Sequence, residues 1–213
     1  MACPDWGTLP EEVEEEEEDD DDELNPLPKW IEGDSFAPFV GTPGEFLDTV
    51  LGLAGITEED VVCDIGSGDG RIPIMAVQKF NARSAIGIEI EEDLVQRARA
   101  HAKRRGVADR VEFFHRDASE FEPTEHGVTV LTVYLLPDSF PLLKDLFMKY
   151  LKAGGRRRLI TISWPLQKEL TPAAVAEAGA ENTATSTSVY LYDASSFAST
   201  STSASTSALE KNI

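Results

Sequence analysis

The sequence contains few residues of the types that build metal centres and disulfide frameworks. Its 213 residues include two cysteines and three histidines. The histidines have no cysteine partners and no ligand spacing, so we expect no metal site. Cys3 lies near the N-terminus and Cys63 lies inside an apolar run, which is not the pattern of a disulfide framework. We interpret Cys63 as a small buried apolar side chain in a reducing compartment.

Long apolar runs and targeting signals are absent from the sequence as well. No stretch of 18 apolar residues is present, so we expect no transmembrane segment. The N-terminus lacks the apolar region of a secretory signal. Its negative charge is opposite to the positive charge of a mitochondrial transit peptide. We therefore expect an intracellular, cytoplasmic protein.

Basic residues are scarce relative to acidic ones. The chain has 19 Lys and Arg against 39 Asp and Glu, a net charge of −20. Residues 11–23 hold 12 of the acids, and the rest of the chain has a net charge of −8. Such a block stays solvated, so we predict a disordered acidic tail over 1–35, either a docking or steering arm or a solubilising leader. The basic clusters 103–105 and 156–158 are short, and we expect no nucleic-acid partner.

The remaining composition suits one globular domain, which we place over 36–194. Hydrophobic residues make up 41% of the chain, and apolar runs alternate with helical patterns. This alternation predicts an α/β fold with a doubly wound, Rossmann-like, mostly parallel sheet and an antiparallel strand at its end. Residues 172–193 should supply the last strands, and the Ser/Thr-rich segment 195–213 is predicted to be a disordered tail. The other predicted strands are 61–65, 84–89, 111–115, 128–135 and 157–163.

The most informative stretch is 61–71, where an apolar run passes through an acid into a glycine-rich turn. Three glycines spaced two apart let backbone amides approach a ligand at the end of a strand: Gly66, Gly68 and Gly70. The dinucleotide fingerprint fits poorly, because the third glycine comes one residue early. Asp64 and Asp69 would also repel a pyrophosphate, whereas they favour a ligand that carries an ammonium or a sulfonium.

Acidic residues also end the next two predicted strands. Glu89 follows Asp64 by 25 residues, close to the spacing that brings a carboxylate to ribose hydroxyls, although it also fits the start of a helix. Asp117 ends the third run, where a plain loop residue is the alternative. The fourth run ends in the turn Tyr134 to Pro137. Agreement between successive strand ends indicates a nucleotide-like cofactor.

The glycine turn resembles motif I of the class I S-adenosylmethionine (SAM) methyltransferases. The segments 38–40, 64–72, 87–89 and 190–197 resemble in particular the protein-lysine methyltransferases of the ATP synthase c-subunit and the adenine nucleotide translocase. The similarity covers roughly 36–197. It implies mitochondria as the alternative compartment. It implies that SAM is bound by Asp64, Gly66, Gly68, Asp69, Gly70, Glu89, Asp117 and Ala118, with Asp117 and Ala118 beside the adenine.

Two features depart from that family. Its animal members carry a hydrophobic N-terminal anchor, where this chain has acids, and residues 164–188 differ from the family's Trp/Pro-rich connection. The turn after the fourth strand also lacks the Asn/Asp-Pro-Pro-Tyr clamp of enzymes that methylate adenine or glutamine nitrogens. The resemblance therefore supports the methyltransferase activity more strongly than it supports a particular substrate or compartment.

The resemblance predicts methyl transfer from SAM to a lysine of a protein substrate. The acceptor amine must lose its proton, and an apolar entrance to the active site, here called the mouth, would favour the neutral form of the amine. Tyr134 and Phe39 are the catalytic candidates, with Trp164 as a third aromatic of the mouth. Core packing is the alternative role for Phe39 and Trp164. A small-molecule methyltransferase and a non-catalytic binding module with an acidic docking arm are the alternative functions.

Overall fold

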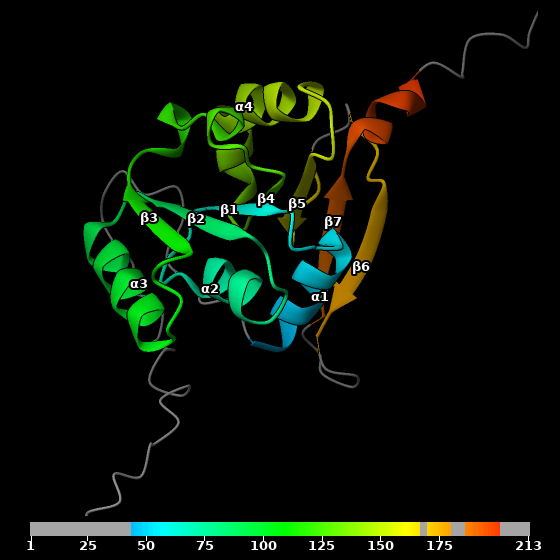
Figure 1. Cartoon of the computed structure of the whole chain (residues 1–213). Coiled ribbons are helices and arrows are strands. Elements are labelled where there is room, and N and C mark those ends of the chain that lie inside the picture. The colour runs from blue at the N-terminus through cyan, green and yellow to red at the C-terminus, as the bar shows by residue number, and fades with distance from the viewer. Residues whose placement is uncertain (1–43, 167–169, 180–185, 201–213) are drawn as a thin grey trace, which may run out of the picture.

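The computed structural model describes residues 44–166, 170–179 and 186–200 (Figure 1). The predicted acidic tail and Phe39 lie outside these residues. Among the described residues, none of the helices is both long and apolar enough to cross a membrane. The same residues contain no group of three His, Cys, Asp or Glu side chains placed to hold a metal ion.

The described strands form one seven-stranded sheet in the order β3-β2-β1-β4-β5-β7-β6. Strand β7 is antiparallel to both of its neighbours, and the other strand pairs are parallel. The doubly wound, mostly parallel fold class is therefore confirmed. The strands are β1 (Val61–Ile65), β2 (Ser84–Glu89), β3 (Val111–His115), β4 (Val130–Val133), β5 (Arg158–Ile162), β6 (Ala174–Ala178) and β7 (Thr187–Tyr192).

Helices cover both faces of this sheet, as Figure 1 shows. One face carries α1 (Gly44–Ala54), α2 (Arg71–Gln78) and α3 (Glu92–Arg104), and the other carries α4 (Phe140–Lys152). Helix α3 has acids in its first turn and basic residues in its last turn, which complements its dipole. Helix α4 begins with a proline in its first turn, where the missing N–H costs no hydrogen bond.

Alternation along the strands divides the core into two clusters. In β1, Val62 packs with the α1 and α2 residues, whereas Cys63 packs with the α4 residues. In β4, Val130 and Leu131 divide in the same way. Cys63 is fully buried, which confirms its interpretation as an apolar core residue. The same alternation directs Asp64 and Thr132 to the α1 and α2 side.

Some predicted boundaries differ from the structure, and the strand expected over 157–163 is β5, one residue shorter at each end. The fourth strand was expected over 128–135 but is β4, Val130–Val133, and a 3-10 turn starts at Pro137, which has no N–H to donate to a ladder. The C-terminal tail was expected to begin at 195, and the structure has a 3-10 helix at that point of the chain. Ala194–Thr200 form a 3-10 helix because the buried Ser196 hydroxyl accepts a hydrogen bond from the Asp193 amide, and the Thr171 amide donates to the Ser196 carbonyl.

Candidate functional site

The glycine loop joins β1 to α2 at the carboxyl edge of the parallel strands. Strands β2 and β4 flank β1 on either side, so the chain reverses its winding direction here, the place where open α/β sheets bind ligands. The loop is held against β2, since the amides of Gly66 and Ser67 both donate to the Ile88 carbonyl at 2.8 and 3.1 Å. The sequence prediction of a turn between a strand and a helix is confirmed.

Glu89 holds the loop from the end of β2. Its Oε2 accepts a hydrogen bond of 2.8 Å from the Gly68 amide, and its Oε1 accepts from the amides of Ile90 and Glu91. Only 7% of the residue is exposed. Burial raises the pKa of Glu89, although the three amides oppose that shift. The carboxyl group therefore lies beside the loop, and its contact with ribose hydroxyls stays a prediction.

Asp64 is the most deeply buried acid of the loop region, with 2% of its surface exposed. Its Oδ1 accepts a 2.6 Å hydrogen bond from the Thr132 hydroxyl of β4, and no other donor among the described residues reaches the carboxyl group. Burial raises its pKa well above the ordinary range, and the charges of Glu89 and Asp69 add to that rise. A buried carboxyl group with two acidic neighbours is a site that favours a cation.

Asp69 is already paired within the protein. Its carboxylate forms an ion pair of 2.6 Å with Arg71, and its carbonyl lies 3.4 Å from His101 Nδ1. Burial lowers the pKa of His101, so this ring does not add a second positive charge to the loop at neutral pH. Asp69 thus forms an ion pair with the first residue of α2. Asp64 differs, because no cation among the described residues is paired with its carboxylate.

The end of β3 brings Asp117 and Ala118 to the same edge of the sheet. Asp117 Oδ1 accepts from the Ser119 amide and hydroxyl, both at 2.7 Å, and thereby caps the 3-10 helix Ala118–Glu120. Ala118 is buried. The segment is connected to β2, because the Arg116 amide donates to the Glu89 carbonyl at 2.9 Å.

The loop glycines are needed for two distinct reasons. Gly66, Gly68 and Gly70 all have φ between 54° and 83°, which side chains rarely adopt. At Gly70 an added Cβ would also lie 2.5 Å from the Phe113 ring, so the approach of the loop to β3 requires a residue without a side chain. At Gly66 the added Cβ would lie 2.8 Å from Leu135, which shows that the loop contacts the turn after β4.

The aromatic candidates are placed differently from one another. Tyr134 follows β4 directly at the carboxyl edge and is half-buried against the core on the α1 and α2 side. Trp164 follows β5 and is 44% exposed, with its carbonyl accepting from the Thr161 hydroxyl at 2.6 Å. Tyr134 thus follows the strand that pairs with β1, on the same side of the sheet as Asp64.

Sequence reasoning missed Thr132 and Leu135. Thr132 contacts Asp64 and Leu135 contacts Gly66, although both lie some 68 residues away along the chain. The sequence signal that could have pointed to Thr132 is its position as a polar residue within the otherwise apolar run of β4. Its partner on β1 follows only from the register of the two strands.

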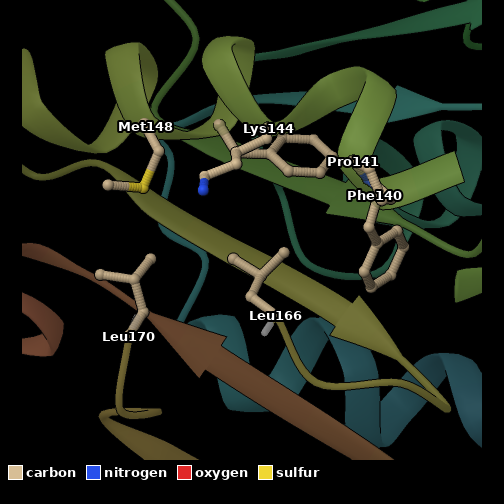
Figure 2. Close-up of a pocket in the computed structure, with 7 residues that line it drawn as sticks. Phe140, Pro141, Lys144, Met148, Leu166 and Leu170 are labelled. Atoms are coloured by element: carbon tan, nitrogen blue, oxygen red, sulfur yellow. The ribbon is translucent and has the colours of Figure 1, made fainter. Parts of the chain in front are cut away.

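An apolar pocket lies apart from this region, between α4 and the segment after β5 (Figure 2). It encloses about 410 Å³, including space open to solvent. Among the described residues, the side chains that line it include no Asp or Glu, in contrast to the carboxyl groups near the loop. The lining includes Phe140, Pro141, Lys144, Met148, Leu166 and Leu170.

Residues 64–174, just over half of the chain, match the family described as the ANTKMT methyltransferase domain. The chain belongs to this family. It is a SAM-dependent methyltransferase, and the family resemblance noted in the sequence is confirmed. The match begins at Asp64 and includes the whole glycine loop, the end of β2, and β4.

Three relatives illustrate the similarity. A protein-lysine N-methyltransferase of Saccharolobus islandicus is 35% identical over 119 residues, 56% of this chain and 73% of the relative. The adenine nucleotide translocase lysine N-methyltransferase of Mus musculus is 34% identical over 120 residues, 56% of this chain and half of the relative. A crystal structure described as an RNA methyltransferase from Salinibacter ruber with S-adenosyl-L-homocysteine is 36% identical, with a TM-score of 0.62, covering 72% of this chain and 92% of that one.

The residues at the loop fit the cofactor. SAM carries two positive groups, the ammonium and the sulfonium, together with ribose hydroxyls and an adenine. The methyltransferase offers the buried Asp64, which has no cationic partner among the described residues, the Glu89 carboxylate beside the loop, and a turn after β3. A phosphate-bearing cofactor would meet repulsion from Asp64 and Glu89 here.

Proposed function

We propose that this methyltransferase N-methylates lysine side chains of a protein substrate. The observation that carries the proposal is its 35% identity to a protein-lysine N-methyltransferase, of which the chain covers 73%. The acidity of the chain also supports it, because an excess of 20 negative charges attracts a lysine-bearing surface.

The proposal extends to the residues that hold SAM. We assign the ammonium to Asp64, the ribose hydroxyls to Glu89 and the adenine to Asp117 and Ala118, with the loop backbone from Gly66 to Gly70 beneath. The cofactor supplies an activated methyl group on a sulfonium. The protein's own task is to fix that group and the acceptor amine in line and to keep water away.

The acceptor lysine must arrive without its proton, since an ammonium has no lone pair to attack with. Its ordinary pKa is about 10.4, and an apolar surround lowers that value because burial penalises the charged form. Tyr134 is our candidate for that surround, as its half-buried ring follows β4 on the Asp64 side of the sheet. Replacing Tyr134 with Ala should lower turnover about 100-fold by loosening the placement of the amine. SAM affinity should stay unchanged, and an equal loss of both would remove Tyr134 from the substrate site.

The test is transfer of labelled methyl from SAM into a whole-cell lysate. Treatment with protease and with ribonuclease separates the acceptors, and acid hydrolysis of labelled protein identifies the modified residue. We expect methyl-lysine in a discrete protein band, and no label with the Asp64→Asn variant. Label confined to small molecules, or to protein residues other than lysine, would contradict the proposal.

Methylation of RNA is the second candidate. It is favoured by the 36% identity to the structure described as an RNA methyltransferase, of which this chain covers 92%. The same labelling experiment decides between the two, because ribonuclease would release the label from an RNA acceptor and protease would not. The net negative charge opposes this candidate, since RNA binding draws most of its affinity from basic residues.

A further inference from the structure

Asp64 and Thr132 form a cross-strand pair at the point where the sheet changes winding direction. They are directly opposite each other in the register of β1 and β4. Alternation directs both side chains to the same face, and both residues are buried, Thr132 completely. The 2.6 Å hydrogen bond between the Thr132 hydroxyl and Asp64 Oδ1 therefore joins two strands that are 68 residues apart.

We propose that Thr132 is a positioning residue that fixes the orientation of the Asp64 carboxylate for the ammonium of SAM. This inference depends on the proposed contact between Asp64 and that ammonium. The Thr132 hydroxyl occupies Oδ1, which leaves Oδ2 without a donor among the described residues. One fixed oxygen and one open oxygen give a carboxylate with a defined direction of approach for a cation.

The surroundings of Asp64 otherwise disfavour its ionised form. Glu89 of β2 and Asp69 of the loop both disfavour the ionised form of Asp64, and burial disfavours it more. The Cys63 thiol on the same strand is neutral, because burial raises its pKa well above the ordinary range. Arg71 is paired with Asp69. Among the described groups near Asp64, the Thr132 hydroxyl is the one that favours the carboxylate.

The chain supplies a matched control on the same two strands. Thr129 lies just before β4, and its hydroxyl donates to Asp60 Oδ1 at 2.8 Å, at the amino end of β1. Thr129→Val and Thr132→Val thus remove the same kind of bond, from threonine to aspartate, at the two ends of one strand pair. Only the second bond lies at the glycine loop.

The experiment is calorimetric titration of the full chain with SAM over pH 5–9 for three single variants, Thr132→Val, Thr132→Ser and Thr129→Val. We expect Thr132→Val to weaken SAM binding about 10-fold, as for the loss of a hydrogen bond to a charged group. Thr132→Ser should restore binding to within about 3-fold. Thr129→Val should leave the Kd unchanged. The acid limb of the binding profile should move to higher pH in Thr132→Val, since the pKa of Asp64 loses a group that lowers it.

Two further variants distinguish failure of this inference from failure of the proposed site. Asp64→Asn should weaken SAM binding, and Thr132→Val added to Asp64→Asn should have no further effect, because Thr132 acts through the carboxylate. If Asp64→Asn leaves the Kd unchanged, the proposed cofactor contact is wrong. If Asp64→Asn weakens binding but Thr132→Val binds normally, or weakens binding equally in both backgrounds, the positioning role is wrong. Denaturant unfolding of each variant identifies any Kd change caused by partial unfolding.

Discussion

Two buried aspartates at opposite ends of β1 have opposite surroundings. Asp60 immediately precedes the strand at the amino edge of the sheet and is 1% exposed, whereas Asp64 lies near the carboxyl edge and is 2% exposed. Asp60 accepts hydrogen bonds from the Thr57 amide and hydroxyl and from Thr129, and it is paired with Arg158. Asp64 has one hydroxyl donor from the described residues and two acids nearby.

The pKa values follow this difference in partners. Burial by itself would raise the pKa of Asp60, but the hydrogen bonds from Thr129 and Thr57 and the Arg158 charge outweigh it and lower the pKa. At Asp64 a single hydroxyl cannot outweigh burial and like charges, so the pKa is raised. The fully partnered acid joins the segment after α1, the residue before β4 and the start of β5. The under-partnered acid is suited to receive a cation from outside.

The largest effect is expected from removing the partnered acid. Asp60→Ala should lower the free energy of unfolding by about 3–5 kcal/mol, because the largely buried Arg158 side chain is left without its counter-charge. Urea unfolding followed by circular dichroism measures this change. The control is Glu59→Ala, whose ion pair with Arg156 is exposed and should contribute less than about 1 kcal/mol. Similar losses in both variants would contradict the structural role of Asp60.

Removing the under-partnered acid should have the opposite effect on stability. Asp64→Asn should raise the free energy of unfolding of the cofactor-free protein by about 0.5–2 kcal/mol, because it removes a buried charge beside Glu89. SAM affinity should fall about 10- to 100-fold as a charged contact is lost. Urea unfolding and calorimetry test both halves. If Asp64→Asn were less stable than the wild type and bound SAM normally, both expectations would be wrong, and Asp64 would be a structural residue like Asp60.

The two acids should also contribute to stability with opposite dependence on pH. The unfolded pKa of both is about 3.9. The native pKa of Asp60 is lower, so its contribution is present above pH 4 and is lost as the pH falls through that lowered value. The native pKa of Asp64 is higher, so its contribution is present below pH 4 and is lost as the pH rises through the raised value.

Unfolding of the wild type and Asp64→Asn between pH 3.5 and 8 measures this dependence. The difference in unfolding free energy should grow in favour of Asp64→Asn as the pH rises. A constant difference would mean that Asp64 does not titrate differently in the native state.

Glycine substitutions at the two edges should have the smallest effect on stability. Gly66 at the carboxyl edge has φ 74°, and Gly106, which follows α3 at the amino edge, has φ 68°. Alanine should cost about 1 kcal/mol of unfolding free energy at each, because both adopt left-handed backbone. Only Gly66→Ala should weaken SAM binding, since its Cβ would approach Leu135, whereas no atom lies within 4 Å of a Cβ at Gly106. Equal SAM affinities of Gly66→Ala and Gly106→Ala would mean that the loop backbone at Gly66 is not part of the cofactor site.

The sequence predicted most of the architecture because the signals are local. Strand β1 ends at Ile65 as expected, and the acid-ended runs at Glu89 and Asp117 lie at one edge because parallel strands align their carboxyl ends. The prediction was less accurate where local composition and tertiary contact disagree. Ser196 belongs to a Ser/Thr-rich run that resembles a disordered tail, yet its backbone and hydroxyl are held by Thr171 and Asp193.

The site was predicted as a set of residues, without their pairing. Asp64, Glu89 and the glycines can be recognised from the sequence, because an acid at the end of an apolar run and closely spaced glycines are local patterns. That Asp69 pairs with Arg71, while Asp64 has Thr132 for its partner, depends on side-chain orientation and on strand register. Asp60 drew no attention in the sequence, because two of its partners, Thr129 and Arg158, come from segments 69 and 98 residues away.

The sequence by itself determined the alternation of strands and helices, the glycine turn and the acids at the strand ends. These features depend on spacing along a few residues, and spacing is a local property of the chain. The tertiary structure alone decided which buried aspartate is paired with a cation and which has no cation among the described residues. That decision rests on burial, and on the charges and donors that distant strands bring within hydrogen-bonding distance, and both exist only once β1, β4 and β5 lie side by side.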